Sequence, residues 1–451
     1  MTKTLKGSMT VFLALIMMMF LILCLVLIEG TRVWFLRANA QQAMELAEFS
    51  ALSEYQKELF EHYGLFFLDL DYEQGSEQTG ILEARLREYL HKNVGEVQTE
   101  NIRVKNICRA TDAEGSSFFE QAAAVMKVQT GYLFIEEIIS NTANIELEEV
   151  DLGEILEKNT RVAKSALSRL QENEEKPDFS ISIPNISFPS IKVLREAVLG
   201  DETILSGKTI NLNDRISCRK LSKGTGKKGS ESLPDMELFY KYLFGHFGYY
   251  GVQNLDVWNS SLEYQLEYIL SGEESDLDNL ENIMWRIFLL RAGGNYLFYH
   301  QDLSKFEKAQ AEAMALVGFL GNPILTEVVT ELMLISQAIE DGIIQTRSVF
   351  AGEKVALYEK GAFSGVLLGY EEYLYLFLRT QKSEEIIYRC MDLVEMEVRE
   401  KSGYEEFRMD HCTDQFEVQW NYQFSSLFRE SGYFKDGTYK NEISRKVFYE
   451  K

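Results

Sequence analysis

The hydrophobic pattern of this chain begins with an unbroken apolar run. It starts at Met9 and ends at Ile28, and its twenty residues carry no charge. As a helix with a rise of about 1.5 Å per residue, the run would be about 30 Å long, which matches the hydrocarbon core of a bilayer. The pattern therefore predicts one transmembrane helix over residues 9–28, preceded by a short tail of residues 1–8.

A cleaved signal peptide has a different pattern. Its apolar core spans about 7–15 residues, and a small-x-small cleavage site follows closely. Here the apolar run is longer, and the first A-x-A-like site, Ala38-Asn39-Ala40, lies well beyond it. We therefore expect a retained anchor in contact with the lipid bilayer.

The residues after Gly30 continue a helical pattern, because apolar positions recur at steps of three and four. These positions are Val33, Leu36, Ala40, Ala43, Ala47, Ala51, Tyr55 and Leu59. No proline interrupts them before Gly64, a typical residue at a helix end. The sequence predicts an amphipathic stem helix over residues 29–63, continuous with the anchor, whose apolar stripe needs a partner surface.

Residues 64–172 predict a membrane-proximal region of helices and strands. Short strands are expected over residues 65–70 and 98–108, the second because Ile102 and Val104 alternate with Arg103 and Lys105. Helices are expected over residues 81–92, 117–140 and 154–172, with a bend near Gly131.

Residues 173–234 are predicted to form a linker, because four of the chain's five prolines lie there. Phe179, Ile181 and Ile183 alternate with serines, which favours an edge strand that proline limits. A basic, glycine-rich loop then starts at Ser222 and ends at Ser230. It lacks the spacing of a Walker phosphate-binding loop, so the pattern favours a solvated loop over a phosphate site.

Residues 235–410 are predicted to be largely helical, punctuated by Gly293-Gly294, Gly321-Asn322-Pro323 and Gly352. The apolar stretch over residues 311–339 contains three glutamates, each of which would cost about 3 kcal/mol at the centre of a membrane helix. It is therefore interpreted as two core helices and not as a second span.

The C-terminal region, residues 411–451, carries the clearest strand pattern. Five large apolar residues alternate with Glu, Gln and Asn between Phe416 and Phe424. A lone strand is not stable, so it should join the segments near 65–70, 98–108 and 179–183 in a small antiparallel sheet. The expected fold class is α+β, mainly α, with a long N-terminal helix and a large helical region.

Composition narrows the set of partners. The chain has 46 Lys and Arg against 70 Asp and Glu, which gives a net charge of −24. Such an acidic body is a poor match for nucleic acid or for anionic lipid head groups. Its 28 Phe and 23 Tyr supply a genuine core and argue against a disordered tail.

The residues that carry chemistry form no recognisable catalytic pattern. The five histidines are not spaced as metal ligands, and no HExxH, GxSxG or DxDxDG motif occurs. His411-Cys412 is the only adjacent imidazole and thiol, and adjacent side chains in a turn point in different directions. The pairs Glu371-Glu372 and Glu384-Glu385 are interpreted as solvated helix faces. We therefore expect no enzyme, no cofactor and no metal site.

The five cysteines leave the cellular compartment open. Cys24 lies within the apolar run, and Cys108, Cys218, Cys390 and Cys412 lie beyond it with no CxxC pair. Outside a membrane these four could form two disulfides. Free buried thiols are an equally good interpretation.

Several strings together resemble a known group of proteins. The start, LKGSMTVFLALIMMM followed by LIEGTRV, resembles the N-terminal signature of the TadE/TadG-like pseudopilin proteins of tight-adherence (Tad) pili. The whole chain is more similar to an uncharacterised family of Gram-positive single-pass membrane proteins associated with such pilus loci. Strings that carry this likeness are YGLFFLD at Tyr63, MKVQ at Met126, LEYILSG at Leu266, NL at Asn279, AIED at Ala338, GYEEYL at Gly369 and CMDLVE at Cys390.

The N-terminus departs from the prepilin pattern in one respect. Prepilin-like substrates are cut after a glycine and carry Glu at the fifth mature position. Cleavage after Gly7 would place Phe12 there, and Glu29 lies at the far end of the apolar run. Processing by a prepilin peptidase is therefore not expected from these residues.

The resemblance implies a bitopic cell-envelope protein whose large domain is exported. The flanking charges agree, because Lys3, Lys6 and the α-amino group precede the run, whereas only Arg32 and Arg37 closely follow it. The implied function is that of a minor pseudopilin or assembly factor of a Tad/Flp-type pilus or secretion system. The alternative is an extracytoplasmic sensor or ligand-binding module. The sequence leaves open whether the stem stripe binds its own domain, a second copy or another pilin-like protein.

Overall fold

The computed structural model describes most of the chain, in two compact units. The described residues are 6–72, 79–128, 133–142, 145, 150–173, 186–200, 203–211, 215–227, 229, 232–252, 261–357, 366–427 and 437–449. The first unit, here called the sheet unit, comprises Met1–Ala124, Lys220–Ser230 and Val398–Lys451. The second, the helical unit, comprises Val125–Arg219 and Glu231–Glu397. The fold is α+β and mainly α, as expected.

The sheet unit begins with one long helix, α1 (Lys6–Leu52), which confirms that the apolar run continues into the stem without a break. The expected continuation to residue 63 is wrong. Ser50 and Ser53 donate side-chain hydrogen bonds to carbonyls of the last turns, and such bonds compete with helix propagation. A second helix, α2 (Lys57–Tyr63), follows and ends at Gly64 in the left-handed conformation, where a stop was predicted.

A four-stranded antiparallel sheet is built around β5 (Cys412–Ser425). The strand β2 (Gln98–Arg109) pairs along one edge of β5, and β1 (Leu68–Asp69) and β6 (Thr438–Phe448) pair along the other. The predicted strands over 98–108 and 416–424 are confirmed, whereas the strand over 65–70 is reduced to two residues. The sequence pattern did not reveal β6.

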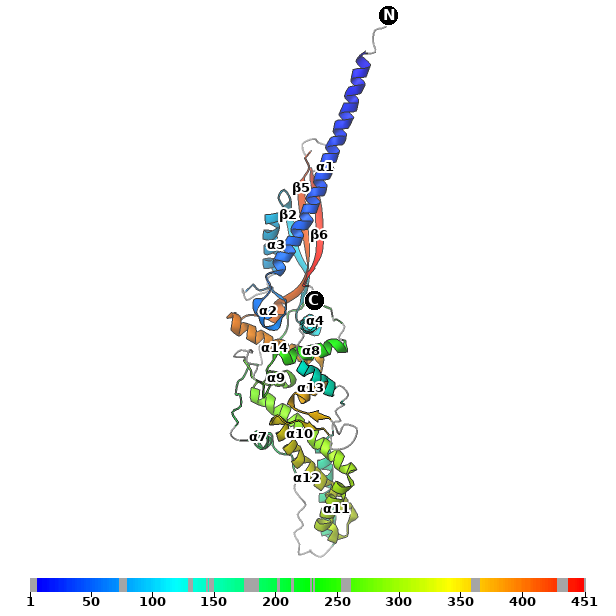
Figure 1. Cartoon of the computed structure of the whole chain (residues 1–451), viewed down its shortest axis with the longest axis vertical. Coiled ribbons are helices and arrows are strands. Elements are labelled where there is room, and N and C mark those ends of the chain that lie inside the picture. Colours follow the sequence, from blue (N-terminus) through cyan, green and yellow to red (C-terminus); the bar gives the residue numbers. More distant parts are fainter. Residues whose placement is uncertain are drawn as a thin grey trace. The chain divides into compact units, whose positions relative to one another are not determined.

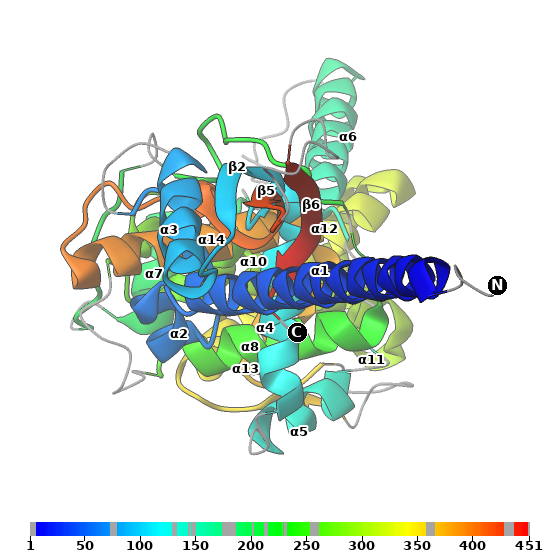
Figure 2. The same ribbon diagram turned by 90° about the horizontal axis from the view of Figure 1, so that it is seen from above.

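The stem stripe packs against the protein's own sheet. Helix α3 (Thr79–Asn93), predicted over 81–92, lies beside α1, and both cover the same sheet face (Figures 1 and 2). Small residues on α1 let its backbone approach closely, and Trp420 and Val418 face them from β5. The α1 residues with almost no exposed surface in this core are Ala40, Ala43, Met44, Ala47 and Ala51.

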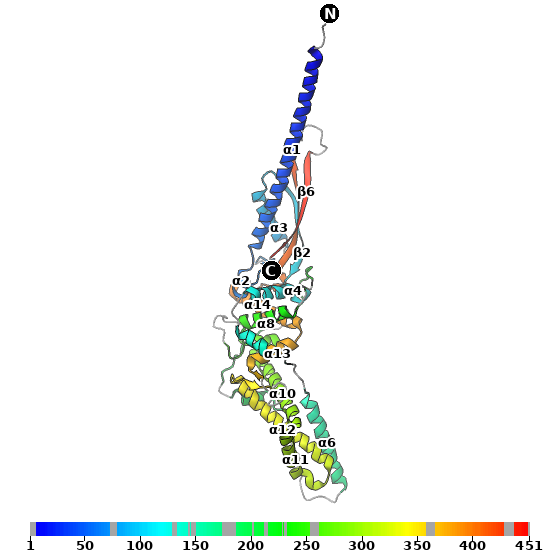
Figure 3. The ribbon, with the colours of Figure 1, turned by 45° about the vertical axis from the view of Figure 1, so that its right-hand side comes forward.

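The helical unit is a stack of helices. They are α5 (Leu133–Thr142), α6 (Leu152–Asn173), α7 (Ile191–Leu199), α8 (Leu233–His246), α9 (Gln265–Ser271), α10 (Asp276–Gln301), α11 (Leu303–Val317), α12 (Pro323–Phe350) and α13 (Tyr370–Thr380), with a small pair of strands, β3 (Val355–Ala356) and β4 (Leu367–Leu368). Helices α10, α11, α12 and α6 pack side by side (Figure 3). Two further helices, α4 (Ser116–Val128) and α14 (Ser383–Ser402), each begin in one unit and end in the other.

The two core helices expected over residues 311–339 are confirmed as the end of α11 and the start of α12. The side chain of Asn322 caps α12 by accepting the N–H groups of Ile324 and Leu325. Gly293-Gly294, in contrast, does not interrupt a helix, because both residues lie inside α10. Close packing explains a glycine on the facing helix, since a Cβ at Gly342 would lie 3.1 Å from the Cβ of Ala292.

Two sequence expectations fall outside the described residues. The bend near Gly131 lies within residues 129–132, and the edge strand of Phe179, Ile181 and Ile183 lies within residues 174–185.

Candidate functional site

The first half of α1 is the most exposed apolar surface in the described chain. Its large apolar side chains from Met9 to Ile28 are all exposed, and the protein's own core covers none of them. Among the described residues, α1 is the one helix long and apolar enough to cross a membrane. Contact with lipid would remove this surface from water.

The second half of α1 carries a second apolar face, opposite the face that packs on the sheet. Trp34 and Phe49 are 72% and 76% exposed, and Phe35 and Leu46 are also largely exposed. Helical spacing places these four side chains within about one third of the helix circumference. Trp34 and Phe35 follow the apolar run closely, where aromatic residues are enriched at membrane interfaces.

Polar contacts hold α1 against the end of the sheet, at the point where the helix extends beyond it. The carboxylate of Glu29 is largely buried and accepts the backbone N–H of Leu427 at 3.3 Å. Arg32 donates to the carbonyl of Ser425, at the end of β5, and forms a 2.7 Å ion pair with Glu96. Glu29 is therefore a structural contact of the helix with the residues just after β5.

The basic loop that starts at Ser222 is held against the rest of the sheet unit through its backbone, whereas the side chains of Lys223 and Lys227 are exposed to solvent. The carboxylate of Asp112 accepts the backbone N–H groups of Gly224 and Gly226 at 2.8 and 3.0 Å. Thr225 donates its N–H to the carbonyl of Ile107, and Gly229 donates its N–H to the hydroxyl of Ser116.

The glycines of this loop are required by close packing. A Cβ at Gly224 would lie 2.3 Å from a carboxylate oxygen of Asp112, and one at Gly226 would lie 2.5 Å from the Cβ of the same residue. A Cβ at Gly229 would lie 2.1 Å from the carboxylate of Glu120. The backbone N–H groups that a phosphate would need already bind Asp112 and Ser116, so the loop is not a phosphate cradle.

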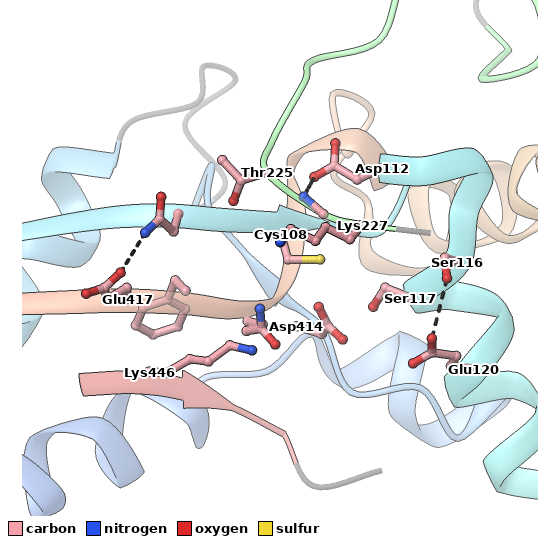
Figure 4. A pocket seen from close by; sticks show the side chains of 14 residues that line it. Cys108, Asp112, Ser116, Ser117, Glu120, Thr225, Lys227, Asp414, Glu417 and Lys446 are labelled. Atoms are coloured by element: carbon pink, nitrogen blue, oxygen red, sulfur yellow. Dashed lines mark hydrogen bonds between the residues drawn. The ribbon is translucent and has the colours of Figure 1, made fainter. Parts of the chain in front are cut away.

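The loop forms one wall of a pocket of about 740 Å³ (Figure 4). Other walls come from the end of β2, the start of α4, and neighbouring parts of β5 and β6. The lining residues are Asn106, Cys108, Asp112, Ser116, Ser117, Glu120, Thr225, Gly226, Lys227, Asp414, Gln415, Phe416, Glu417 and Lys446. Its volume lies in the range typical of ligand sites.

The inner part of this pocket is polar. Ser117 is only 5% exposed, and its hydroxyl has no hydrogen-bond partner within the protein. In Figure 4, Ser117 and Glu120 project from α4 toward Asp414 on β5. Lys227 and Lys446 are exposed at the rim. Four chain segments that are far apart in sequence thus meet here, which sequence spacing alone could not reveal.

The two pairs of adjacent glutamates, Glu371-Glu372 and Glu384-Glu385, differ in burial. Glu384 and Glu385 are exposed on α14, as expected. Glu372 is instead fully buried, where it accepts the N–H of Gly369 at 2.9 Å and the ammonium of Lys354 at 2.7 Å. The spacing of Gly369 and Glu372 at the start of α13 fits a capping arrangement and was the available sequence signal. Burial raises the pKa of the neighbouring Glu371.

His411 and Cys412 do not form a dyad. The ring Nδ1 of His411 lies 2.7 Å from a carboxylate oxygen of Asp71, whereas the thiol of Cys412 lies 3.6 Å from the carbonyl of Arg408. All five cysteines are free thiols in the structure. Within the described chain, no group of three or more acidic, histidine or cysteine side chains is arranged to hold a metal ion.

The helical unit contains a buried carboxylate with an altered pKa. Glu267 is fully buried and accepts hydrogen bonds from the Tyr370 hydroxyl at 2.6 Å and the Tyr250 N–H at 2.8 Å. Burial nevertheless raises the pKa of Glu267 to about 7. Asp392 is held similarly, by Ser217 and Tyr268, and burial raises its pKa also.

Comparison with known proteins gives one match. The sequence model of a family of unknown function (DUF5702) matches residues 171–364 and 358–424, which together cover more than half of the chain. No curated protein and no solved structure matches it.

Proposed function

The chain belongs to the DUF5702 family of unknown function, and we propose that it is a membrane-anchored structural protein that joins an assembly in the cell envelope. In this proposal α1 crosses the bilayer once, with its N-terminus in the cytoplasm and both folded units outside. The protein acts as a minor pseudopilin or assembly factor of a tight-adherence type system, and its role includes no catalytic step.

The main support for the proposal is that the two halves of α1 lie in different environments. The first half is exposed and apolar, and the second half packs by one face on a sheet and leaves a second apolar face outward. A helix anchored in this way presents Trp34, Phe35, Leu46 and Phe49 at a fixed orientation above the membrane. The fitting partner is the apolar side of another helix that is anchored beside it.

The direction of insertion is proposed from charge. The N-terminal flank carries Lys3 and Lys6, and the positive-inside rule favours the cytoplasm for that flank. The acidic body then lies on the opposite side. Protease added to intact protoplasts should digest both folded units, and their complete protection would contradict the proposed topology.

The outer face of α1 can be tested directly by photo-crosslinking. A photoreactive residue placed at Phe49 or Trp34 in the full chain, in its native membrane, should yield adducts with α1 of a second copy or with another pilin-like subunit. Arg37 is the matched control, because it is exposed on the same helix but points about 120° away from the centre of the apolar face. Equal yields at Arg37 and Phe49, or adducts with lipid alone, would contradict the assembly role.

The alternative is an envelope ligand-binding module, and the pocket of about 740 Å³ favours it. The two functions differ in what they require of α1. A ligand-binding module tolerates polar residues at Trp34 and Phe49, whereas an assembly subunit does not. Survival of pilus or secretion function in a Trp34→Ser, Phe49→Ser double variant would favour the binding module.

A further inference from the structure

We propose that the pocket between β2, β5, β6 and α4 of the sheet unit binds a primary ammonium group. The group is carried either by a lysine side chain of a protein partner or by a free alkylamine. The proposal does not depend on the assembly role, because none of its residues belongs to α1.

The pocket is a built site and not an incidental hollow. Asp112 holds the glycine-rich loop through its contacts with Gly224 and Gly226, and this loop forms the wall that carries Lys227. Positions 224 and 226 have no room for a side chain. The loop geometry that creates the cavity is thus encoded at specific residues.

The buried hydroxyl of Ser117 points to a ligand. Its side chain lines the cavity, is 95% removed from solvent, and has no hydrogen-bond partner within the protein. A buried polar group without a partner is unfavourable, and native structures contain few of them. A ligand atom in the cavity would supply the missing partner.

The charges of the lining favour a cation. Four carboxylates face two lysines around the cavity. Three of them accept hydrogen bonds from known partners: Asp112 from backbone N–H groups, Glu417 from the side chains of Asn106 and Ser444, and Glu120 from the hydroxyl of Ser116 at 3.4 Å. Asp414 and Glu120 face the interior together with Ser117. An anion at this position would be opposed by two carboxylates, whereas a cation would be stabilised by both.

The number of acceptors matches one particular cation. An alkylammonium group has three N–H donors and no acceptor. The carboxylates of Asp414 and Glu120 and the hydroxyl of Ser117 offer three acceptor groups, one for each N–H, from two elements. A divalent metal is a poorer fit, because no set of three ligating side chains converges within the described residues. Lys227 and Lys446 at the rim then favour an acidic group next to the amine.

The test is isothermal titration calorimetry on the full chain in detergent micelles. The probes are 5-aminopentanoate for a free amine that also carries an acidic group, and a short peptide with one lysine, beside the same peptide with that lysine acetylated, for a protein partner. We expect saturable binding of one or both amines and none of the acetylated peptide. Glu120→Gln and Ser117→Ala should each weaken binding about tenfold, because each removes one polar partner.

Two controls keep the result interpretable. Glu442→Gln removes an exposed carboxylate from the same polar face of the sheet, outside the pocket, and should leave affinity unchanged. The thermal unfolding temperature of each variant reports whether it is folded, and Glu120 is half-buried, so its amide isostere should fold. Absence of amine binding, an equal effect of Glu442→Gln, or binding of inorganic phosphate that is lost in Lys227→Met would overturn the proposal.

Discussion

Glu48, largely buried on α1, and Arg445, whose side chain on β6 is partly exposed, form an ion pair with 3.5 Å between a carboxylate oxygen and the guanidinium Nε. Burial raises the pKa of Glu48 to about 6, although the charge of Arg445 opposes this rise. The contact lies on the face by which α1 packs on the sheet. We therefore expect the packing of α1 on the sheet to depend on pH.

The first prediction concerns the sign of this pH dependence. Between its ordinary pKa of about 4.5 and the folded value of about 6, Glu48 is protonated in the folded chain and ionised in the unfolded chain. The contribution of Glu48 to stability therefore falls as pH rises through this window. In Glu48→Gln the free energy of unfolding, relative to wild type, should rise by about 2 kcal/mol between pH 4.5 and pH 7.

Urea unfolding of the full chain at several pH values measures this difference. Glu45→Gln is the control, because Glu45 is the exposed partner of the same arginine at 2.9 Å. If Glu45→Gln showed the same pH dependence of the unfolding free energy, the effect would be due to Arg445. If the difference between Glu48→Gln and wild type did not change with pH, the argument from burial of Glu48 would be contradicted.

The spacing of apolar residues along the sequence predicted those helices and strands that have one apolar face packed in a core. The stripe of α1, the alternation in β2 and the alternation in β5 each identified the buried face correctly, because an amphipathic element shows its environment in its own sequence. The strand β6 was missed because Asn441 and Arg445 alternate with Tyr439, Ile443 and Val447 on its inward face, where Arg445 pairs with Glu48 of α1, and so interrupt the apolar positions. Edge strands often carry such charges, and the charges hide the period.

The pocket could not be predicted for a different reason. Its lining comes from segments near residues 106–120, 225–227, 414–417 and 446, and only the folded sheet brings them together. The sequence did show the glycine-rich loop, but it did not show that Asp112 binds that loop. Likewise, Glu371-Glu372 resembles any exposed acidic pair until the cap at Gly369 buries one member.

The second prediction separates the two faces of α1. Ala47 is fully buried against the sheet unit, whereas Phe49 is 76% exposed. Ala47→Leu should lower the stability of the sheet unit by about 1–3 kcal/mol, because added methyl groups overpack the core. Phe49→Ala should leave stability within about 0.5 kcal/mol and reduce crosslinking to neighbouring subunits. Equal destabilisation by both changes would show that the outer face also belongs to the fold.

The third prediction tests the glycine-rich loop. Gly226→Ala would place a Cβ 2.5 Å from the Cβ of Asp112 and 2.9 Å from the thiol of Cys108. The loop should move away from the sheet and become more accessible, so trypsin should cleave at Lys223 and Lys227 faster than in wild type. Gly207→Ala is the control, because a Cβ there meets no atom within 4 Å. Unchanged cleavage in Gly226→Ala would contradict the clamped arrangement.

The fourth prediction concerns Glu267, whose pKa burial raises from about 4.5 to about 7. In this window the folded helical unit retains a proton that the unfolded chain releases, so stability falls as pH rises from 4.5 and is lowest above 7. Gln at this position keeps an acceptor for Tyr370 and Tyr250 without the buried charge. The free energy of unfolding of Glu267→Gln, relative to that of wild type, should rise by about 3 kcal/mol between pH 4.5 and pH 8.

Hydrogen exchange of the α9 amides in the full chain, followed from pH 5 to pH 8 and corrected for the intrinsic rate, measures this change locally. Glu384→Gln provides the matched control, since it removes an exposed carboxylate from the same unit. One oxygen of Glu267 has no hydrogen-bond partner within the protein, so ionisation would leave part of the negative charge buried without a donor. Protection that stays constant with pH in the wild type would mean that the carboxylate remains ionised through compensation from the neighbouring tyrosines.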